Sequence, residues 1–310
     1  AGGDDGSFLW HACPGRLVFL SASVGAPATL DAGGRGWIAG SSTMAPAFTP
    51  LRTAALWLSQ QRLTTEAPDR LNALLSIAGY FALGLVGLAL VPIGPDTTLI
   101  ALPTSVVAWG ACESLVVVVV FLHGWSPNAP LALIGAYRYV AIGLPIMLLS
   151  MFVLIAAALP AQSLDLRDIV TSQSSVWNVI RQPLGLPLFI LLGLSLTLRG
   201  PFDYADSADL AGGTSVEASG PDRLGWQIAR LVMLTGFSAV AASVFRGGYR
   251  GPVLPGPLWL AIKTLAIMTV VIGLSHLLAR MPVARMMGLI WIGLLPLSFL
   301  DLVLAGVLAL

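Results

Sequence analysis

Charged side chains inside long apolar stretches are the first candidates for chemistry in this sequence. Four of them are Glu113, Arg138, Lys263 and Asp301. A charge placed among lipid is costly unless it is paired or hydrated, so membrane proteins keep such charges mostly for function. We therefore expect these four side chains to lie on a path for protons across the membrane.

Each of these residues also has a plainer structural explanation. Glu113 could be a buried carboxyl group that is hydrogen-bonded to Arg138 or to the backbone. Lys263 stands about one turn inside its apolar stretch, so it could extend its ammonium group to the lipid headgroups. Asp301 could pair with a neighbouring subunit or line a hydrated cavity. The sequence leaves these alternatives open.

A second group of charges follows the apolar stretch that ends near residue 198. Its members with candidate roles are Arg199, Phe202, Asp203, Asp206, Asp209 and Glu217. A loop with this composition at the membrane edge can hold acids and ordered water beneath a bound molecule. The alternative is a solvated acidic loop that docks a basic partner.

The elements that must position these residues are membrane-spanning helices. Of the 310 residues, 56% are hydrophobic and 10% are charged, whereas a soluble domain has about 25% charged residues. Stretches of about 20 apolar residues, the length that crosses a bilayer, are predicted at 8–30, 73–94, 99–123, 131–159, 184–198, 224–245, 258–279 and 286–309. The sequence predicts an all-α polytopic membrane protein with about eight transmembrane helices.

The chain is predicted to be a single membrane domain, residues 1–310. The stretch from Pro50 to Arg70 has the apolar spacing of an amphipathic helix that lies at the interface after the first span. Tryptophans near the ends of predicted helices are typical interfacial anchors: Trp57, Trp125, Trp177, Trp226 and Trp259.

The distribution of basic residues predicts the orientation of the chain. The odd-numbered loops carry more arginine than the even-numbered loops, and basic loops tend to stay in the cytoplasm. We therefore expect residues 199–223 to form an acidic cytoplasmic loop. The N-terminus is then expected outside.

Charge and cysteine content exclude several classes of function. A net charge of +1 does not provide the basic surface that nucleic-acid binding needs. Cys13 and Cys112 are far apart and have no metal-ligand spacing. We expect no metal, iron–sulfur or other redox cofactor to be bound by this chain alone.

The segment from Trp177 to Gly220 carries a resemblance to a known family. It contains the following motifs: Trp177-Asn178, Gln182 to Gly185, Arg199 with Pro201-Phe202-Asp203, and Glu217 to Gly220. These motifs resemble those of the H subunit of complex I, the NADH-quinone oxidoreductase. Weaker agreement extends the resemblance over residues 50–310 and leaves 1–49 poorly matched.

The sequence also departs from the family pattern at several positions. Leu196 stands where the family has a glutamate in an E-T-N-R stretch, and Gly143-Leu144-Pro145 stands where it has Glu-Ile-Pro. The R-x-G-P-N loop is hard to find between Gly33 and Pro50. Arg285 lacks the acid of the family's Arg-x-Asp element. The chain resembles a divergent member of this family or a paralogue.

The resemblance implies a membrane-arm subunit of a respiratory assembly in the cell inner (plasma) membrane. Such a subunit forms part of the quinone site and couples quinone reduction to proton translocation, with quinone as a shared substrate. The implied partners are the iron–sulfur and quinone-site subunits of the hydrophilic arm, together with antiporter-like and small membrane-arm subunits and lipid. The iron–sulfur clusters would lie in these partners.

Three other interpretations remain open from the sequence. The equivalent membrane subunit of an energy-converting hydrogenase or formate-oxidising complex would need no quinone. A scaffold paralogue would keep the fold and the docking loop without coupling, which the missing carboxylates favour. A secondary transporter would predict inverted repeats, and the sequence has no such symmetry.

Overall fold

The computed structural model of the protein describes residues 25–35, 48–95 and 97–309, and these ranges contain helices and no strand. Six helical segments are long and apolar enough to cross a membrane. They are Arg70–Leu90 (α3), Ser105–Trp125 (α4), Pro130–Ala161 (α5, Pro130–Ala158, with η2, Leu159–Ala161), Gly220–Arg246 (α9), Gly256–Leu277 (α10) and Val283–Leu308. The last one combines α11 (Val283–Gly288), a π-helical turn η5 (Leu289–Leu294) and α12 (Leu295–Ala309). The prediction of an all-α polytopic membrane protein is confirmed.

Two of the eight predicted spans differ from these six. The span predicted at 184–198 is the shorter apolar helix α8 (Gly185–Leu196). Its 12 residues cover about 18 Å at 1.5 Å per residue, whereas the hydrocarbon core is about 30 Å thick. The chain after α8 therefore turns inside the bundle. The first predicted span, 8–30, lies mostly outside the described residues, and the described stretch 25–35 is helical.

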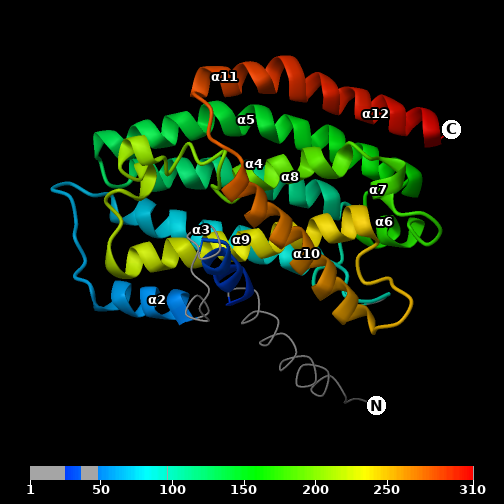
Figure 1. Ribbon diagram of the computed structural model, residues 1–310, viewed down its shortest axis with the longest axis horizontal. Coiled ribbons are helices and arrows are strands. Elements are labelled where there is room, and N and C mark those ends of the chain that lie inside the picture. The colour runs from blue at the N-terminus through cyan, green and yellow to red at the C-terminus, as the bar shows by residue number, and fades with distance from the viewer. Residues whose placement is uncertain (1–24, 36–47, 96, 310) are drawn as a thin grey trace, which may run out of the picture.

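The long helices run side by side along the long axis of the molecule (Figure 1). The combined α11–α12 segment follows α5 at one edge, and α2 (Thr49–Ser59) lies beside α9 at the opposite edge. The helix α2 occupies the place of the predicted amphipathic helix, and none of its residues is buried. The remaining short elements are α6 (Leu166–Ser172), α7 (Asn178–Arg181), η3 (Ala208–Leu210) and η4 (Gly213–Ser215).

The helix α9 is the most deeply buried of the long helices. It packs closely against α3 through two glycines, because a Cβ atom at Gly236 would lie 2.6 Å from the carbonyl oxygen of Gly84. Small residues let membrane helices approach to this distance and form extensive van der Waals contact. This packing fixes α9, which carries Arg230, at the centre of the bundle.

The connections between helices gather at two ends of the bundle. At one end Asp69 N–H donates to the Ser126 carbonyl (2.8 Å) and the Tyr204 hydroxyl donates to the Met281 carbonyl (2.7 Å). This charged end consists of segments 60–69, 126–129, 197–219 and 278–282, which contain the described parts of the odd-numbered loops. The opposite end consists of segments 91–95, 97–104, 159–184 and 247–255.

Candidate functional site

The helix α8 ends inside the bundle in a turn that sets the direction of Arg199. Leu198 adopts the left-handed backbone conformation, with φ of 52°. Its N–H donates to the Ser195 carbonyl (3.1 Å), and the Arg199 N–H donates to the Leu194 carbonyl (2.9 Å). These two bonds form a Schellman motif. The motif ends the helix and leads the chain into the loop 199–219.

Two tyrosines from other helices donate to carbonyl groups at the end of α8. The Tyr139 hydroxyl on α5 donates to the Ser195 carbonyl (3.2 Å), and the Tyr80 hydroxyl on α3 donates to the Leu196 carbonyl. Both tyrosines and Leu196 are fully buried. Tyr80 satisfies a carbonyl group at the helix end, where the last carbonyls lack helical partners, and Tyr139 adds a second donor to the Ser195 carbonyl, which already accepts from the Leu198 N–H. The end of α8 is therefore held from two sides within the bundle.

Arg230 on α9 connects the end of α8 to the loop acids. Its guanidinium donates to the carbonyls of Thr197 (3.2 Å) and Leu198, and it forms an ion pair with Asp206 (3.0 Å). The Asp206 carboxylate also accepts hydrogen bonds from the hydroxyl groups of Thr214 (2.5 Å) and Ser215 (3.1 Å). We call Arg230, Asp206, Thr214 and Ser215 the Asp206 cluster.

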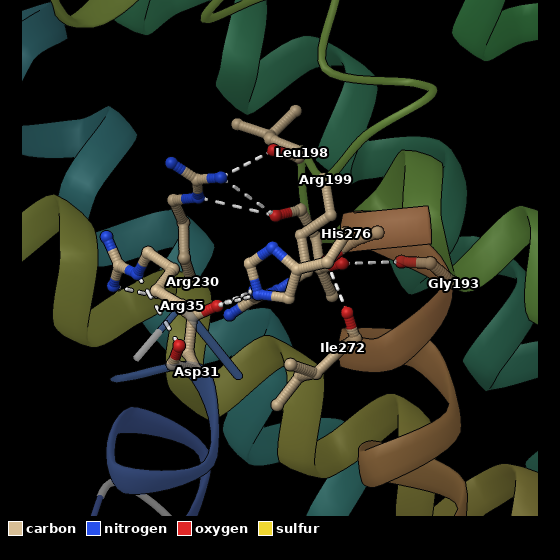
Figure 2. Close-up of polar contacts among 10 residues, drawn as sticks. Asp31, Arg35, Gly193, Leu198, Arg199, Arg230, Ile272 and His276 are labelled. Carbon is tan, nitrogen blue, oxygen red and sulfur yellow. Dashed lines mark hydrogen bonds and ion pairs between the residues drawn. The ribbon is translucent and has the colours of Figure 1, made fainter. Parts of the chain in front are cut away.

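A second cluster joins the described helical stretch 25–35 to the ends of α8 and α10 (Figure 2). Asp31 lies 3.0 Å from Arg199, 3.2 Å from the Nε2 atom of His276 and 2.8 Å from Arg35. Burial alone would raise the pKa of Asp31, but Arg199 and Arg35 outweigh it and lower the pKa. Asp31 is therefore held as an anion in this Asp31 cluster.

A third cluster lies at the surface of the charged end. Asp209 pairs with Arg138 (2.7 Å) and Arg280 (3.0 Å), and Arg280 also lies 3.8 Å from Asp203. Hydrogen bonding from Arg138 lowers the pKa of Asp209 to about 2. Burial raises the pKa of Asp203 in spite of Arg280. This Asp209 cluster therefore holds one firmly ionised acid beside one that takes up a proton more readily.

The loop residues between these clusters differ in exposure. Phe202 and Tyr204 are buried beneath the loop, while Glu217 is exposed near its end. The predicted group Arg199, Phe202, Asp203, Asp206 and Asp209 is thus brought together at the charged end, with Arg138 added from α5. The loop packs against the helices and is therefore not the freely solvated acidic loop that one alternative predicted.

Glu113 lies apart from these three clusters, in the interior of α4. Its Oε2 atom accepts a hydrogen bond from the Ser150 hydroxyl on α5 (2.5 Å). Its Oε1 atom is buried and has no partner among the described residues. Arg138, which was one suggested partner, instead pairs with Asp209. The carboxyl group is buried with one of its two oxygen atoms unused.

Lys263 binds backbone carbonyl groups at the opposite end. Its ammonium group donates to the carbonyls of Arg246 (2.6 Å), Gly248 (3.0 Å) and Arg250 (2.6 Å), just where α9 ends. The Trp177 ring also lies 5.0 Å from this cation. The side chain is 2% exposed, so it does not extend to the headgroups as one alternative suggested.

Asp301 on α12 is buried and faces the interior of the bundle. It accepts a hydrogen bond from the Gln182 side chain, which also donates to the Val153 carbonyl on α5 (3.2 Å). Asp301 therefore connects α12 to the segment that precedes α8. It lies at a distance in sequence and structure from the loop 199–219.

Several residues of the site were not singled out by the sequence motifs. Asp31, Thr214 and the two tyrosines complete the clusters, and a polar residue inside or just after an apolar stretch was the only signal for them. Trp226 was predicted to be an interfacial anchor, and this prediction is wrong. Its ring is fully buried and stacks on His123, with ring centroids 3.7 Å apart.

No metal site is found in the part of the chain that the structure describes. Three or more His, Cys, Asp or Glu side chains nowhere gather closely enough in it to hold an ion. Cys112 is a free, buried thiol. The site consists of paired charges and hydroxyl groups, which can hold and move protons.

The fold and this site define a polytopic membrane protein with buried, paired charges at one end. Residues 40–306 match the family described as NADH dehydrogenase, and the chain belongs to this family. It is 32% identical to the H 1 subunit of the NADH-quinone oxidoreductase of Rhodopseudomonas palustris strain HaA2 over 255 residues, which cover 81% of this chain and 79% of that protein.

Two further relatives are H subunits of the same oxidoreductase. The chain is 33% identical to the H 1 subunit of R. palustris strain BisB5, over 72% of this chain and 70% of the relative. It is 30% identical to the H 2 subunit of R. palustris strain ATCC BAA-98 / CGA009, over 81% of this chain and 79% of the relative. The resemblance to the H subunit of complex I that the motifs suggested is confirmed.

Proposed function

We propose that this protein is a membrane-arm subunit of a complex I-like respiratory assembly, where it helps to form the quinone site and couples quinone reduction to proton translocation. The observation that carries the proposal is the convergence of three ion-pair clusters on the loop 199–219. Two of the clusters bring arginines from α5 and α9 and from the connection after α10 to acids of one loop. In the third, Arg199 of the same loop pairs with Asp31. A change of charge near this loop would therefore reach several helices.

The coupling step follows from the electrostatics of these pairs. Reduction of a quinone near the loop adds negative charge, which raises the pKa of neighbouring carboxylates. Asp203, whose pKa burial already raises, and Asp206 would then take up protons. A protonated acid no longer holds its arginine by charge, so Arg230 and Arg280 would change partners. Arg199, Phe202 and Glu217 would line or flank this site.

Within the membrane, Glu113 and Asp301 are the candidates for carrying protons onward, and Arg138, which pairs with Asp209 at the charged end, would stand at the start of their path as a fixed cation. The unused oxygen atom of Glu113 supports its place among them, because it can accept a proton or a water. The position of Lys263 supports a structural role instead. Its three carbonyl partners fix the end of α9, and they use all three of its N–H donors.

The partners and the location follow from the same proposal. The iron–sulfur and quinone-site subunits would dock at the charged end and would supply the electrons. Antiporter-like and small membrane-arm subunits, with lipid, would cover the apolar flanks. The arginine bias supports a bacterial plasma membrane protein with the charged end in the cytoplasm and the N-terminus outside.

A scaffold that docks the redox subunits without coupling is the second candidate function. It is favoured by Leu196 and Gly143, which are buried where the family has acids. A path of carboxylates through the membrane would then be interrupted at two places. The ratio of protons moved to quinone reduced separates the two functions.

The first experiment is the gentle purification of the protein from its native membrane. Mass spectrometry should find iron–sulfur subunits and antiporter-like subunits with it, and vesicles that contain the assembly should move protons when quinone is reduced. Nickel–iron hydrogenase subunits would support the hydrogenase alternative. Copurification of the redox subunits without proton movement would support the scaffold, and purification without either kind of partner would contradict all three.

A further inference from the structure

A pocket opens at the charged end next to the Asp206 cluster. It lies between the segment from Arg62 to Arg70, the end of α4 and the loop that leads into α9, and its volume is about 70 Å³. His123, Thr214 and Glu217 are among its lining residues. This volume has room for a few water molecules and is too small for a quinone headgroup with its tail. We call it the side pocket.

His123 presents an unpaired ring nitrogen in this region. Its ring is 4% exposed and stacks on Trp226. Its Nδ1 atom lies 3.3 Å from the Ser76 hydroxyl oxygen, which also lies 2.8 Å from the Ala73 carbonyl oxygen. Nδ1 therefore has a hydrogen-bond partner in either tautomer of the ring.

The other ring nitrogen of His123 is unpaired. In a neutral imidazole the Nε2 atom either donates or accepts one hydrogen bond, according to the tautomer. That Nε2 atom is buried and has no partner among the described residues. A buried polar atom without a partner is costly, and a water molecule from the side pocket would satisfy this nitrogen in either tautomer, because water both donates and accepts.

Thr214 connects the side pocket to Asp206. It lines the pocket, and its hydroxyl group donates to the Asp206 carboxylate over 2.5 Å. Thr214 is fully buried behind the pocket wall, and its hydroxyl oxygen keeps lone pairs that can accept from a water that enters from the pocket. A continuous line of hydrogen bonds can then run from the pocket through Thr214 to Asp206, while the exposed Glu217 stands at the rim.

We infer that the side pocket is a water-filled port through which protons reach Asp206, with His123 ordering the water and Thr214 passing the proton. In each transfer a protonated water gives its proton to the Thr214 oxygen, as the Thr214 hydroxyl hydrogen moves to the Asp206 carboxylate. Rotation of the hydroxyl group then restores the starting arrangement. The products are a neutral water, an unchanged Thr214 and a protonated Asp206, whose charge pair with Arg230 is lost.

The inference rests on the proposed function, and one pair of variants tests it in the intact assembly. Thr214→Val keeps the shape of the side chain but removes the hydroxyl group, and Thr214→Ser keeps the hydroxyl group. In membrane vesicles, we expect Thr214→Val to lower the number of protons moved per quinone reduced several-fold. Thr214→Ser should retain most of the wild-type ratio.

A second variant covers the case in which Thr214→Val fails to assemble. His123→Phe keeps a flat ring on Trp226 and removes both nitrogens, so it should also lower the proton ratio while quinone reduction in the presence of an uncoupler persists. A wild-type ratio of protons moved to quinone reduced in His123→Phe or in Thr214→Val would overturn the inference that the side pocket is a proton port. Wild-type vesicles that reduce quinone without moving protons would instead contradict the proposed function itself.

Discussion

The two ends of the bundle satisfy their charges in different ways. At the charged end, ion pairs join segments far apart in the chain, such as Arg230 with Asp206 and Arg138 with Asp209. At the opposite end, Arg167 pairs with Asp165 only two residues away, and Lys263 binds backbone carbonyls. The Arg167–Asp165 pair joins no distant segments, and the carbonyl partners of Lys263 cannot change protonation. The carboxylates of the charged end can change protonation, and each connects separate segments. The comparison suggests that the charged end transmits charge and the opposite end holds the fold.

Removing the central arginine should give the largest effect. Arg230→Met leaves Asp206 without its cation and the Thr197 and Leu198 carbonyls without the Arg230 donor, so the free energy of unfolding should fall by about 3 to 5 kcal/mol. Chemical denaturation of the purified protein in detergent measures this loss. Arg223→Met on the same helix is the control, since Arg223 is exposed and its guanidinium lies over the Trp57 ring at the surface. An equal loss of unfolding free energy in both variants would show that Arg230 does not hold the charged end together.

At the opposite end, Lys263→Met should destabilise the protein without affecting coupling. The change leaves three carbonyls unpaired, which costs about 2 to 3 kcal/mol in the free energy of unfolding. The proton-to-quinone ratio of the protein that still assembles should match that of wild type. Ile262→Met is the neighbouring control, because Ile262 is 48% exposed. A reduced proton-to-quinone ratio in Lys263→Met would contradict the purely structural role and would support the original prediction that Lys263 lies on the proton path.

The turn after α8 allows a test of backbone conformation alone. Leu198 has a positive φ, which glycine adopts freely and alanine does not. Both Leu198→Gly and Leu198→Ala lose the buried side chain, but the glycine variant should be the more stable by about 1 kcal/mol. Comparison of their denaturation midpoints measures the difference. The reverse order would mean that the Schellman turn is not formed as described.

The smallest expected effect is a dependence on pH at the Asp209 cluster. The pKa of Asp209 is lowered from 3.8 to about 2, so its stabilising contribution is complete above about pH 4 and is lost as the pH falls towards 2. The Asp209 side chain is 51% exposed, so screening limits the contribution to about 0.5 kcal/mol. The difference in melting temperature between wild type and Asp209→Asn should therefore shrink below pH 4. A constant difference would show that the pairing is not electrostatic.

The sequence predicted the spanning helices well because their signal is local. Apolar stretches of sufficient length must become helices in lipid, and seven of the eight predicted spans correspond to described helices. The loop motif around Asp203 also identified the charged end. The short helix α8 was read as a full span, since the apolar stretch continues to Leu198 although the helix ends at Leu196.

The partners of the charges could not be predicted in the same way. Asp31 reaches Arg199 across 168 positions of the chain, and nothing in the local sequence specifies that contact. Lys263 resembles a snorkelling lysine by its position, but its carbonyl partners come from the turn after α9. His123 gained a role only when the structure showed its buried Nε2 atom without a partner among the described residues. Such assignments depend on packing between helices, which the pattern of one segment does not contain.

The most direct test of the central claim compares one aspartate from each end. Asp206→Asn and Asp165→Asn both neutralise an acid that pairs with an arginine, at the charged end and at the opposite end respectively. The ratio of protons moved to quinone reduced would be measured in vesicles that contain each assembled variant. We predict that Asp206→Asn lowers this ratio strongly and that Asp165→Asn leaves it unchanged. A wild-type ratio in Asp206→Asn, or an equal loss in both variants, would contradict the account.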